Sequence, residues 1–355
     1  MFAGQTGAGK STLASAVSAD LQVSDGAVEF STDELRAYHP RLTYLLRHDV
    51  ERANPLTDPD ARRWVQMAVR YAIEHRYNVL YDGTLSRPDA ARETAQVFRD
   101  GGYRTAVVFV ATPAANSSLS VLTRYQDQVE RRGHGRFIHN HDETYDGVLR
   151  TADAIDTEHL VDEVRVYRRG GTLLYANELT GQGQWQNPPG LRGAIEAERH
   201  RPRTPEEFDR FVVEVTDLAD RMDPGWRDRI AAAAERAGPL LTLPRDQHDL
   251  DLLVTGLRRD PQHPDSIDKS PEIATLRELA GQRIQARLTQ SHHPGRTGLA
   301  GIEAALERLR ERLERPGQAV APQPVEPSEI TRARRERDRR TEGPSRGSGH
   351  RGPQV

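Results

Sequence analysis

Short apolar runs alternate with amphipathic stretches along the first half of the chain. Residues 26–31, 77–82 and 104–110 are rich in β-branched and aromatic side chains, which favours strands. Between these runs, apolar residues recur three or four positions apart, which predicts helices. The predicted helices begin near residues 12, 32, 58, 86 and 141, and another follows Pro113. This alternation indicates an α/β fold around a mostly parallel sheet.

The pattern changes after a predicted hairpin. Residues 164–167 and 172–175 flank Gly170-Gly171, which predicts two antiparallel strands at the sheet edge. Thr204 and Glu207 then have the spacing of a capping box, with Pro205 at the first helical position. Further helices are predicted at 224–237, 247–258, 270–289 and 302–313. We therefore divide the chain into an α/β domain at 1–178, a linker at 179–203, a helical region at 204–315 and a disordered tail at 316–355.

Composition narrows the class of protein. The chain has 355 residues, a net charge of −3 and no cysteine, so disulfides, thiolate metal sites and a cysteine nucleophile are excluded. No apolar run approaches the roughly 18 residues of a membrane span, and no signal peptide is recognisable. An arginine cluster at 332–340 is interrupted by acids, which favours a solvated tail over nucleic-acid or lipid binding. We expect a cytoplasmic protein that binds neither membranes nor nucleic acid.

A phosphate-binding loop lies at the start of the chain. Eight residues follow the G-x-x-x-x-G-K-[ST] pattern, namely Gly4, Gln5, Thr6, Gly7, Ala8, Gly9, Lys10 and Ser11, and Thr12 continues from them into a predicted helix. Successive backbone N–H groups of such a loop suit phosphate oxygens, Lys10 reaches the β- and γ-phosphates, and Ser11 ligates Mg²⁺. Lysine is otherwise avoided, since the chain has only Lys10 and Lys269. Only three residues precede Gly4, so we expect the natural first strand to begin upstream of Met1.

Two carboxylates follow predicted strands. Asp33 comes directly after the strand at 26–31, and Asp82 ends the strand at 77–82 before Gly83-Thr84. Strand ends next to a phosphate loop carry the chemistry in parallel α/β sheets, so Asp33 is a candidate base and Asp82 a candidate ligand for a substrate hydroxyl or for Mg²⁺ through water. Asp33 alternatively offsets the dipole of its own helix, and its position alone leaves both readings open.

Arginines and histidines form a further set of candidates. Arg124 and Arg136 lie on and after the helix that follows Pro113, where they could clamp a transferring phosphate. A solvated charge run is the alternative, and composition alone favours it. His139 and His141 lack neighbouring ligands in the sequence, which argues against a metal site.

Taken in order, these motifs resemble the zeta toxin family, the small-molecule kinases of bacterial toxin–antitoxin systems. The resemblance covers about residues 1–178 and rests on the order and spacing of its motifs, which are the phosphate loop, Thr32-Asp33-Glu34-Leu35-Arg36 with His39-Pro40, Asp82-Gly83-Thr84, Thr123-Arg124-Tyr125, Gly135-Arg136-Phe137, His141-Asp142, and Val164 to Tyr167 with Gly171 to Tyr175.

The resemblance implies an adenylate-kinase-like P-loop fold with a three-layer parallel sheet, which uses ATP (or GTP) and Mg²⁺. The implied reaction phosphorylates a UDP-activated amino sugar, typically UDP-N-acetylglucosamine at its 3′-hydroxyl. By resemblance Asp33 is the base, while Lys10, Arg124 and Arg136 stabilise phosphoryl charge. Arg36 belongs to the Asp33 motif and is included with the substrate-binding candidates Asp33, Asp82 and Thr84. Ser86 stands where the family commonly has Arg.

The implied partner is a small helical antitoxin that obstructs the nucleotide site. Two other functions remain open at the sequence level. The chain is alternatively a P-loop kinase for another hydroxyl, such as an antibiotic or a polynucleotide end. It is otherwise a non-catalytic nucleotide-binding protein whose helical region binds a partner.

Overall fold

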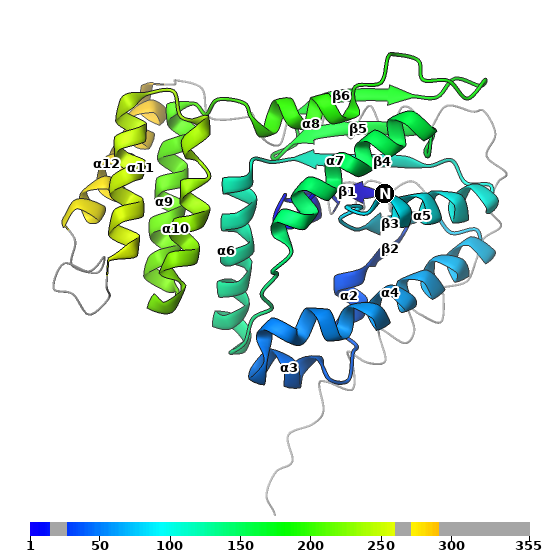
Figure 1. Ribbon diagram of the computed structural model, residues 1–355, viewed down its shortest axis with the longest axis horizontal. Coiled ribbons are helices and arrows are strands. Elements are labelled where there is room, and N and C mark those ends of the chain that lie inside the picture. The colour runs from blue at the N-terminus through cyan, green and yellow to red at the C-terminus, as the bar shows by residue number, and fades with distance from the viewer. Residues whose placement is uncertain (15–26, 260–270, 291–355) are drawn as a thin grey trace, which may run out of the picture. The chain divides into compact units, whose positions relative to one another are not determined.

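A computed structural model describes residues 1–14, 27–259 and 271–290 (Figure 1). Its centre is a sheet of strands in the order β2-β3-β1-β4-β5-β6. The strands are β1 (Phe2–Ala3), β2 (Val28–Ser31), β3 (Val79–Asp82), β4 (Ala106–Ala111), β5 (Glu163–Arg168) and β6 (Leu173–Glu178). The first five run parallel, and β6 returns antiparallel to β5 at the edge, as the hairpin pattern predicted.

The short strand β1 occupies the centre of the sheet. It pairs with both β3 and β4, and Phe2 is in register with Asp82. On the other side of β3, Ser31 at the end of β2 is also in register with Asp82. The register therefore aligns the carboxyl ends of β1, β2 and β3, from which the phosphate loop, Asp33 and Asp82 follow.

In the described residues, four helices cover one face of the sheet, and the start of one further helix packs on the other. One face packs on α4 (Val50–Glu74), α5 (Pro88–Asp100), α7 (His141–Glu158) and α8 (Leu191–Arg199). Phe109 of β4 packs against these helices. Val110, the next residue along β4, joins Phe2 and Leu13 in a separate cluster on the opposite face. The helix that begins at Lys10 therefore belongs to the second face. This is the arrangement of a P-loop fold, with the phosphate loop at the carboxyl end of a central strand.

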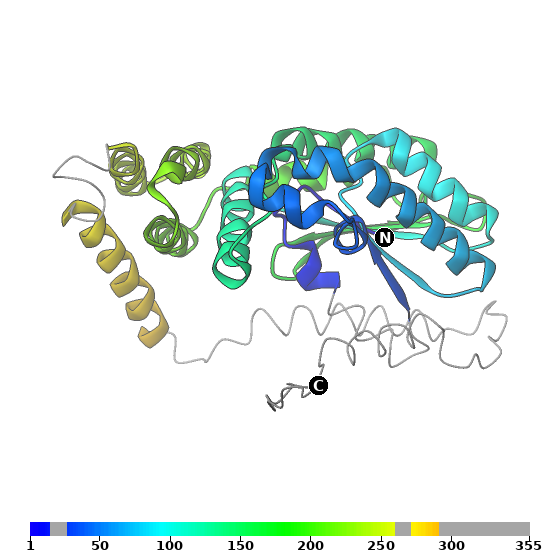
Figure 2. The ribbon, with the colours of Figure 1, turned by 90° about the horizontal axis from the view of Figure 1, so that it is seen from below.

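Beside the sheet, a group of four helices packs on α6 (Ala114–Arg132): the first two of them contact α6, and the last two pack on the first two (Figures 1 and 2). They are α9 (Pro205–Arg221), α10 (Arg227–Glu235), α11 (Pro244–Arg258) and α12 (Pro271–Gln290). One apolar cluster joins Leu119 and Leu122 of α6 to Phe208, Phe211 and other side chains of these helices. The α6 helix therefore belongs to both the α/β part and the helical part.

Several predicted boundaries need correction. The helix predicted to start at 58 begins at Val50, because Asp49 caps the backbone N–H of Arg52 at 3.2 Å and the helix continues through Pro55 and Pro59. The helix predicted to begin near residue 32 is α2 (Thr32–Arg36), and its cap is Ser31, whose hydroxyl accepts from the N–H of Glu34 at 2.9 Å. The helix predicted to begin near residue 86 is α5, which begins at Pro88, directly after Arg87.

Other parts of the prediction concern the second half of the chain. The capping box of Thr204 and Glu207 is confirmed, with both hydrogen bonds present. The segment 179–203, predicted as a linker, contains the helix α8. The helix predicted at 302–313 and the tail at 316–355 lie outside the described residues. Among the described ranges, no helix combines the length and apolar character of a bilayer span.

Candidate functional site

The phosphate loop is fixed by its contacts with neighbouring elements. Gly7 has φ of +78°, and a Cβ built on it would lie 2.1 Å from the carbonyl oxygen of Ser117 on α6. The loop therefore needs glycine at this position both for its conformation and for its close approach to α6. The hydroxyl of Thr112, just after β4, donates to the carbonyl of Ala8 at 2.9 Å, and Thr6 contacts Thr144 of α7.

Gln5 holds the inner side of this loop. Its side chain is fully buried, and its amide nitrogen donates to the carbonyl of Thr112 at 2.6 Å. Its backbone carbonyl accepts from the N–H of Ala8 at 3.1 Å and from Lys10 Nζ at 3.2 Å. Gln5 therefore connects the end of β4 to the position of the lysine.

Lys10 interacts electrostatically with the carboxylates of Asp82 and Asp33. Its ammonium donates to the carbonyl of Gly4 at 2.9 Å, in addition to the carbonyl of Gln5. Burial lowers the pKa of Lys10, while the charges of Asp82 and Asp33 act in the opposite direction. The loop lysine and both predicted acids therefore share one electrostatic environment.

Asp33 is surrounded by arginines. Arg136 donates from Nη1 to Oδ1 at 2.6 Å and contacts Oδ2 through Nη2. Arg36 donates to Oδ1 at 2.8 Å, and Arg124 approaches Oδ2 at 3.4 Å. The Asp33 side chain stays 41% exposed, so it keeps a side open to solvent. The structure thus brings together three predicted cations and the predicted base.

These contacts determine the protonation of Asp33. Burial raises the pKa of the Asp33 carboxyl, but the charge and hydrogen bonds of Arg136, with smaller effects of Arg124 and Arg36, outweigh burial and hold the pKa well below its usual range. Asp33 is therefore ionised at neutral pH. It is a weak base while the arginines remain paired with it.

Asp82 has the opposite character. Burial raises its pKa, partly offset by Lys10, and its Oδ1 atom is buried without a hydrogen-bond partner among the described atoms. Thr84 lies two residues further on, with its hydroxyl 3.2 Å from that of Ser86 and its carbonyl accepting from the N–H of Gly4 at 3.2 Å. Between them and α5, Leu85 has φ of +45°, a left-handed conformation that non-glycine residues rarely adopt.

These residues fit an Mg²⁺ ion that a bound nucleotide helps to hold. Ser11 is exposed at the start of its helix, and Asp82 supplies a buried oxygen with unused acceptor capacity. In the described part of the chain, no group of His, Asp and Glu side chains is arranged to hold a metal ion unaided. His141 instead hydrogen-bonds Ser117 at 2.8 Å and Asp142 at 2.8 Å.

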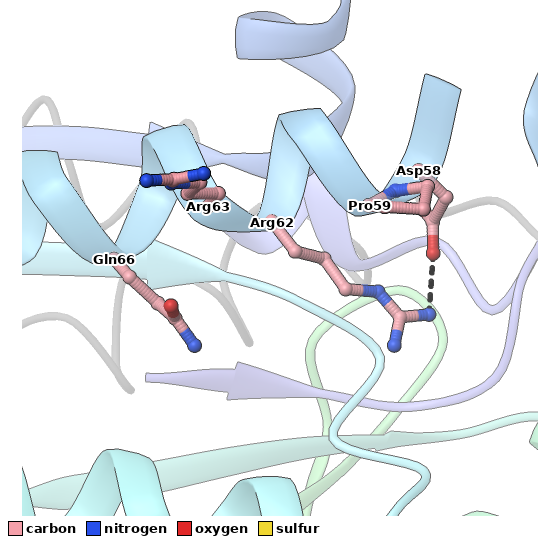
Figure 3. Close-up of a pocket in the computed structure, with 5 residues that line it drawn as sticks. All are labelled: Asp58, Pro59, Arg62, Arg63 and Gln66. Carbon is pink, nitrogen blue, oxygen red and sulfur yellow. Dashed lines mark ion pairs between the residues drawn. The ribbon is translucent and has the colours of Figure 1, made fainter. Parts of the chain in front are cut away.

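A pocket lies along α4 (Figure 3). It is lined by Asp58, Pro59, Arg62, Arg63 and Gln66. Arg62 pairs with Asp58 at 2.5 Å, and Asp58 also accepts from Arg36, the same side chain that holds Asp33. Arg36 therefore contacts both Asp58, which lines this pocket of basic side chains, and Asp33, the candidate base.

The helical part packs against the segments that carry Arg124 and Arg136. Trp226 packs on Tyr125, the neighbour of Arg124, with ring centroids 4.5 Å apart, and on Phe137, the neighbour of Arg136, at 5.0 Å. We define Tyr125, Phe137 and Trp226 as the aromatic cluster. Tyr125 and Phe137 directly follow Arg124 and Arg136 in the sequence, and Trp226 packs on both of their rings. The aromatic cluster therefore fixes the two segments that carry these arginines.

Sequence reasoning missed two contributors to this site. The local sequence does not reveal that Trp226 supports the site, because a tryptophan in a helical region usually indicates core packing. Arg199 of α8 donates to the side chain of Gln5 at 2.9 Å although it lies in the predicted linker. In a chain with so many arginines, only the three-dimensional structure distinguishes this one from the surface arginines.

The fold and the loop together define a P-loop protein of the α/β class. Its residues 1–180 match the family model described as Zeta toxin, which is half of the chain. The chain belongs to the zeta toxin family, whose members are nucleotide-binding toxins with a kinase-like P-loop.

Known relatives share this half of the chain. The chain is similar to "Toxin PezT" of Streptococcus pneumoniae serotype 4 (strain ATCC BAA-334 / TIGR4), with 26% identity over 49% of this chain and 70% of that protein. It is also similar to "Toxin zeta" of Streptococcus pyogenes, with 24% identity over 50% of this chain and 62% of that protein.

A solved structure agrees with the fold. It comes from the characterisation of the PezAT chromosomal toxin–antitoxin system of Streptococcus pneumoniae, with a TM-score of 0.52 and 20% identity over 61% of this chain and 85% of that one. The predicted α/β P-loop fold is therefore confirmed.

Proposed function

We propose that this protein is a kinase that transfers the terminal phosphoryl group of ATP to a hydroxyl of a UDP-activated amino sugar, in the manner of the zeta toxin family. The observation that carries the proposal is the convergence of Lys10, Arg124 and Arg136 around Asp33 at the carboxyl ends of the strands. Phosphoryl transfer needs alignment, concentrated positive charge and a carboxylate to orient the nucleophile, and little else.

Asp33 orients the acceptor and receives its proton. The acceptor hydroxyl donates to the open side of the carboxylate, its oxygen bonds to the terminal phosphorus, and the bond to the ADP oxygen breaks. The proton passes to Asp33 as the hydroxyl oxygen loses it. Phosphate oxygens that draw Arg124 and Arg136 away from Asp33 would raise its pKa, so that nucleotide binding itself makes Asp33 a better base.

The cations stabilise the charge that develops on the transferred group. Lys10 would move from its present carbonyl partners to the β- and γ-phosphates, and the two arginines would contact the equatorial oxygens. Ser11, with Asp82 through water, would hold Mg²⁺, which supplies charge neutralisation between the phosphates. Asp82 and Thr84 would contact the sugar hydroxyls.

The acceptor side suits a substrate that carries phosphates of its own. Arg62 and Arg63 line the pocket beside Asp58, and Arg36 connects that pocket to Asp33. Arginine is the side chain best matched to diphosphate oxygens. This arrangement supports a UDP-sugar over a neutral alcohol as the acceptor.

The test is incubation of the full chain with ATP, Mg²⁺ and UDP-N-acetylglucosamine, followed by detection of the phosphorylated sugar. Asp33→Asn should lose roughly 10²–10⁴-fold in turnover while it still binds ATP. Asp60→Asn is the matched control, because Asp60 lies on α4 and pairs only with His39 among the described contacts. Absence of transfer by the unmodified chain, or equal turnover in Asp33→Asn, rejects this acceptor and this base.

A panel of acceptors separates the alternatives. Because Ser86 stands where the family commonly has Arg, the panel should include an aminoglycoside-type antibiotic and a polynucleotide end. Transfer only to one of these would assign a different kinase. ATP binding without any acceptor-dependent turnover would favour a nucleotide-binding interaction protein.

We further propose an antitoxin partner. Membership of the zeta toxin family supports it, as does the likeness to a toxin whose structural description concerns a toxin–antitoxin system. A small helical protein that covers the phosphate loop should form a stable complex with the chain and prevent ATP binding. A complex that binds ATP as well as the free chain does would argue against this mode of inhibition.

A further inference from the structure

We propose that Arg199 is a positioning residue for the phosphate loop, acting through Gln5. Arg199 lies on α8, beyond the residues 1–180 that match the family model. The inference rests on the proposed function only in assuming that this loop binds ATP, and it does not depend on which acceptor is used.

Arg199 is buried without an acidic partner. Its side chain is only 2% exposed, and among the described residues no carboxylate pairs with it. Burial lowers its pKa to about 10, so it remains charged at neutral pH. An unpaired buried cation is costly to a fold, which means that its neutral partners must be well placed to hold it.

Those partners are the loop and α7. One terminal nitrogen of Arg199 donates to Gln5 Oε1 at 2.9 Å, and the other donates to the carbonyl of Tyr145 at 2.8 Å. The guanidinium also stacks over the Tyr145 ring, with 3.7 Å between its central carbon and the ring centroid. The guanidinium thus bridges α7 and the loop in a single orientation.

Gln5 transmits this position to the lysine. With Oε1 held by Arg199 and its amide nitrogen held by the carbonyl of Thr112, the side chain of Gln5 has one orientation. The backbone carbonyl of the same residue receives both Ala8 N–H and Lys10 Nζ. Loss of Arg199 would leave a buried amide oxygen unsatisfied in the residue whose backbone carbonyl holds Lys10, which favours displacement of the loop.

Arg203 provides a matched control. It follows α8, is 7% exposed, has its pKa lowered by burial to about 10, and stacks over Phe211 at 4.3 Å. It hydrogen-bonds Asn116 on α6, and none of the contacts described for it reaches the phosphate loop. Arg199 and Arg203 therefore differ in their partner and not in burial.

The experiment measures ATP binding to the full chain by calorimetry in the presence of Mg²⁺. Arg199→Met should bind ATP roughly ten-fold more weakly, because the buried amide of Gln5 loses a charged donor. Arg203→Met should stay within about two-fold of the unmodified chain, although both variants lose comparable thermal stability. In a Gln5→Met background, Arg199→Met should cause almost no further loss of affinity, since both changes remove the same contact.

Each outcome decides the matter. Equal ATP affinities of Arg199→Met and Arg203→Met, or additive effects with Gln5→Met, would reduce Arg199 to a packing residue and overturn the proposal. If Arg199→Met fails to fold, Arg199→Lys against Arg203→Lys repeats the comparison, because one ammonium cannot reach both Gln5 and Tyr145. A chain that binds ATP normally but phosphorylates no acceptor removes the kinase proposal and leaves this one standing, whereas a chain that binds no ATP overturns both.

Discussion

The carboxylate of Asp33 combines two properties at the scale of a single residue. It is held ionised by arginines, and it keeps 41% of its side chain open to solvent. Its pairing with arginines gives Asp33 a role in stability, and its exposed side gives it a role in the proposed reaction. A group used for both is expected to show its contribution in the pH dependence of unfolding.

Asp33→Asn tests this contribution to stability. A carboxyl with a pKa below its ordinary value stabilises the folded state above that ordinary value, and the stabilisation is lost as the pH falls toward the folded-state pKa. Because Asp33 is partly exposed and screened, the variant should lose only about 1 kcal/mol of unfolding free energy at pH 7. The difference from the unmodified chain should shrink below about pH 4, as followed by urea denaturation.

Asp89→Asn is the control for this measurement. Asp89 is 85% exposed and pairs with Arg92 on the surface, so its replacement should change stability by only a few tenths of a kcal/mol, roughly, at either pH. A difference for Asp33→Asn that grows on acidification would contradict the assigned direction of the pKa shift.

The sequence predicted individual residues unevenly. Lys10, Asp33 and Asp82 are found by elementary rules, because a phosphate loop and strand ends reveal them, and the structure does bring their charges together. Arg124 and Arg136 are not distinguishable from surface arginines by composition, and only the family resemblance identified them. Their convergence on Asp33 depends on long-range packing that no local pattern contains. The catalytic roles remain predictions for all five.

At the scale of elements, α7 meets the loop after β3 without room for a side chain. Gly147 lies in this helix, and a Cβ built on it would be 2.1 Å from the carbonyl oxygen of Ser86. Glycine in a helix usually costs stability, so its presence here follows from the close approach of helix and loop. That loop also carries Thr84, which is a proposed contact of the acceptor.

Gly147→Ala should therefore be harmful, although alanine is the better helix former. We expect roughly 1–3 kcal/mol of destabilisation and a raised KM for the acceptor, because backbone must move to admit the methyl group. Gly193→Ala on α8 is the matched control, since nothing lies within 4 Å of its Cβ position. It should gain up to about 1 kcal/mol in thermal unfolding experiments. A stabilised Gly147→Ala with unchanged KM would show that α7 and the loop can separate freely.

Local rules predicted the elements well and their ends less well. The strands at 79–82 and 106–111 and the capping box of α9 follow from periodicity and cap chemistry. The start of α4 was misplaced because Pro55 and Pro59 resemble helix breakers, whereas the hydroxyl of Thr57 donates to the carbonyl of Ala53 at 2.6 Å within a continuous helix. Helix α8 was missed because its flanking Gly, Asn and Pro residues resemble a linker.

At the scale of the whole molecule, the family-matched segment is not self-contained. Leu191 and Ile195 of α8 are buried in the same cluster as β4 and α7, and α6 presents Leu119 and Leu122 to the helices that follow. A chain of residues 1–180 would expose these surfaces, at a cost of roughly 1.5–3 kcal/mol for each large apolar side chain uncovered. We expect this fragment to lack a cooperative thermal transition that the full chain shows. A fragment that melts cooperatively would contradict this dependence.

The aromatic cluster gives the sharpest test of how the helical part supports the proposed reaction. Trp226→Ala should cost roughly 2–4 kcal/mol of stability and also reduce turnover several-fold, because Tyr125 and Phe137 lose the ring that fixes the segments of Arg124 and Arg136. Trp185→Ala removes another half-buried tryptophan, which donates to the carbonyl of Asp156 at 2.8 Å and has no described contact with the arginine-bearing segments. Trp185→Ala should therefore lose stability but keep its turnover at temperatures where both variants are folded. Equal turnover in the two variants would mean that Arg124 and Arg136 hold their positions without the helical part, and that α9 to α12 serve stability alone.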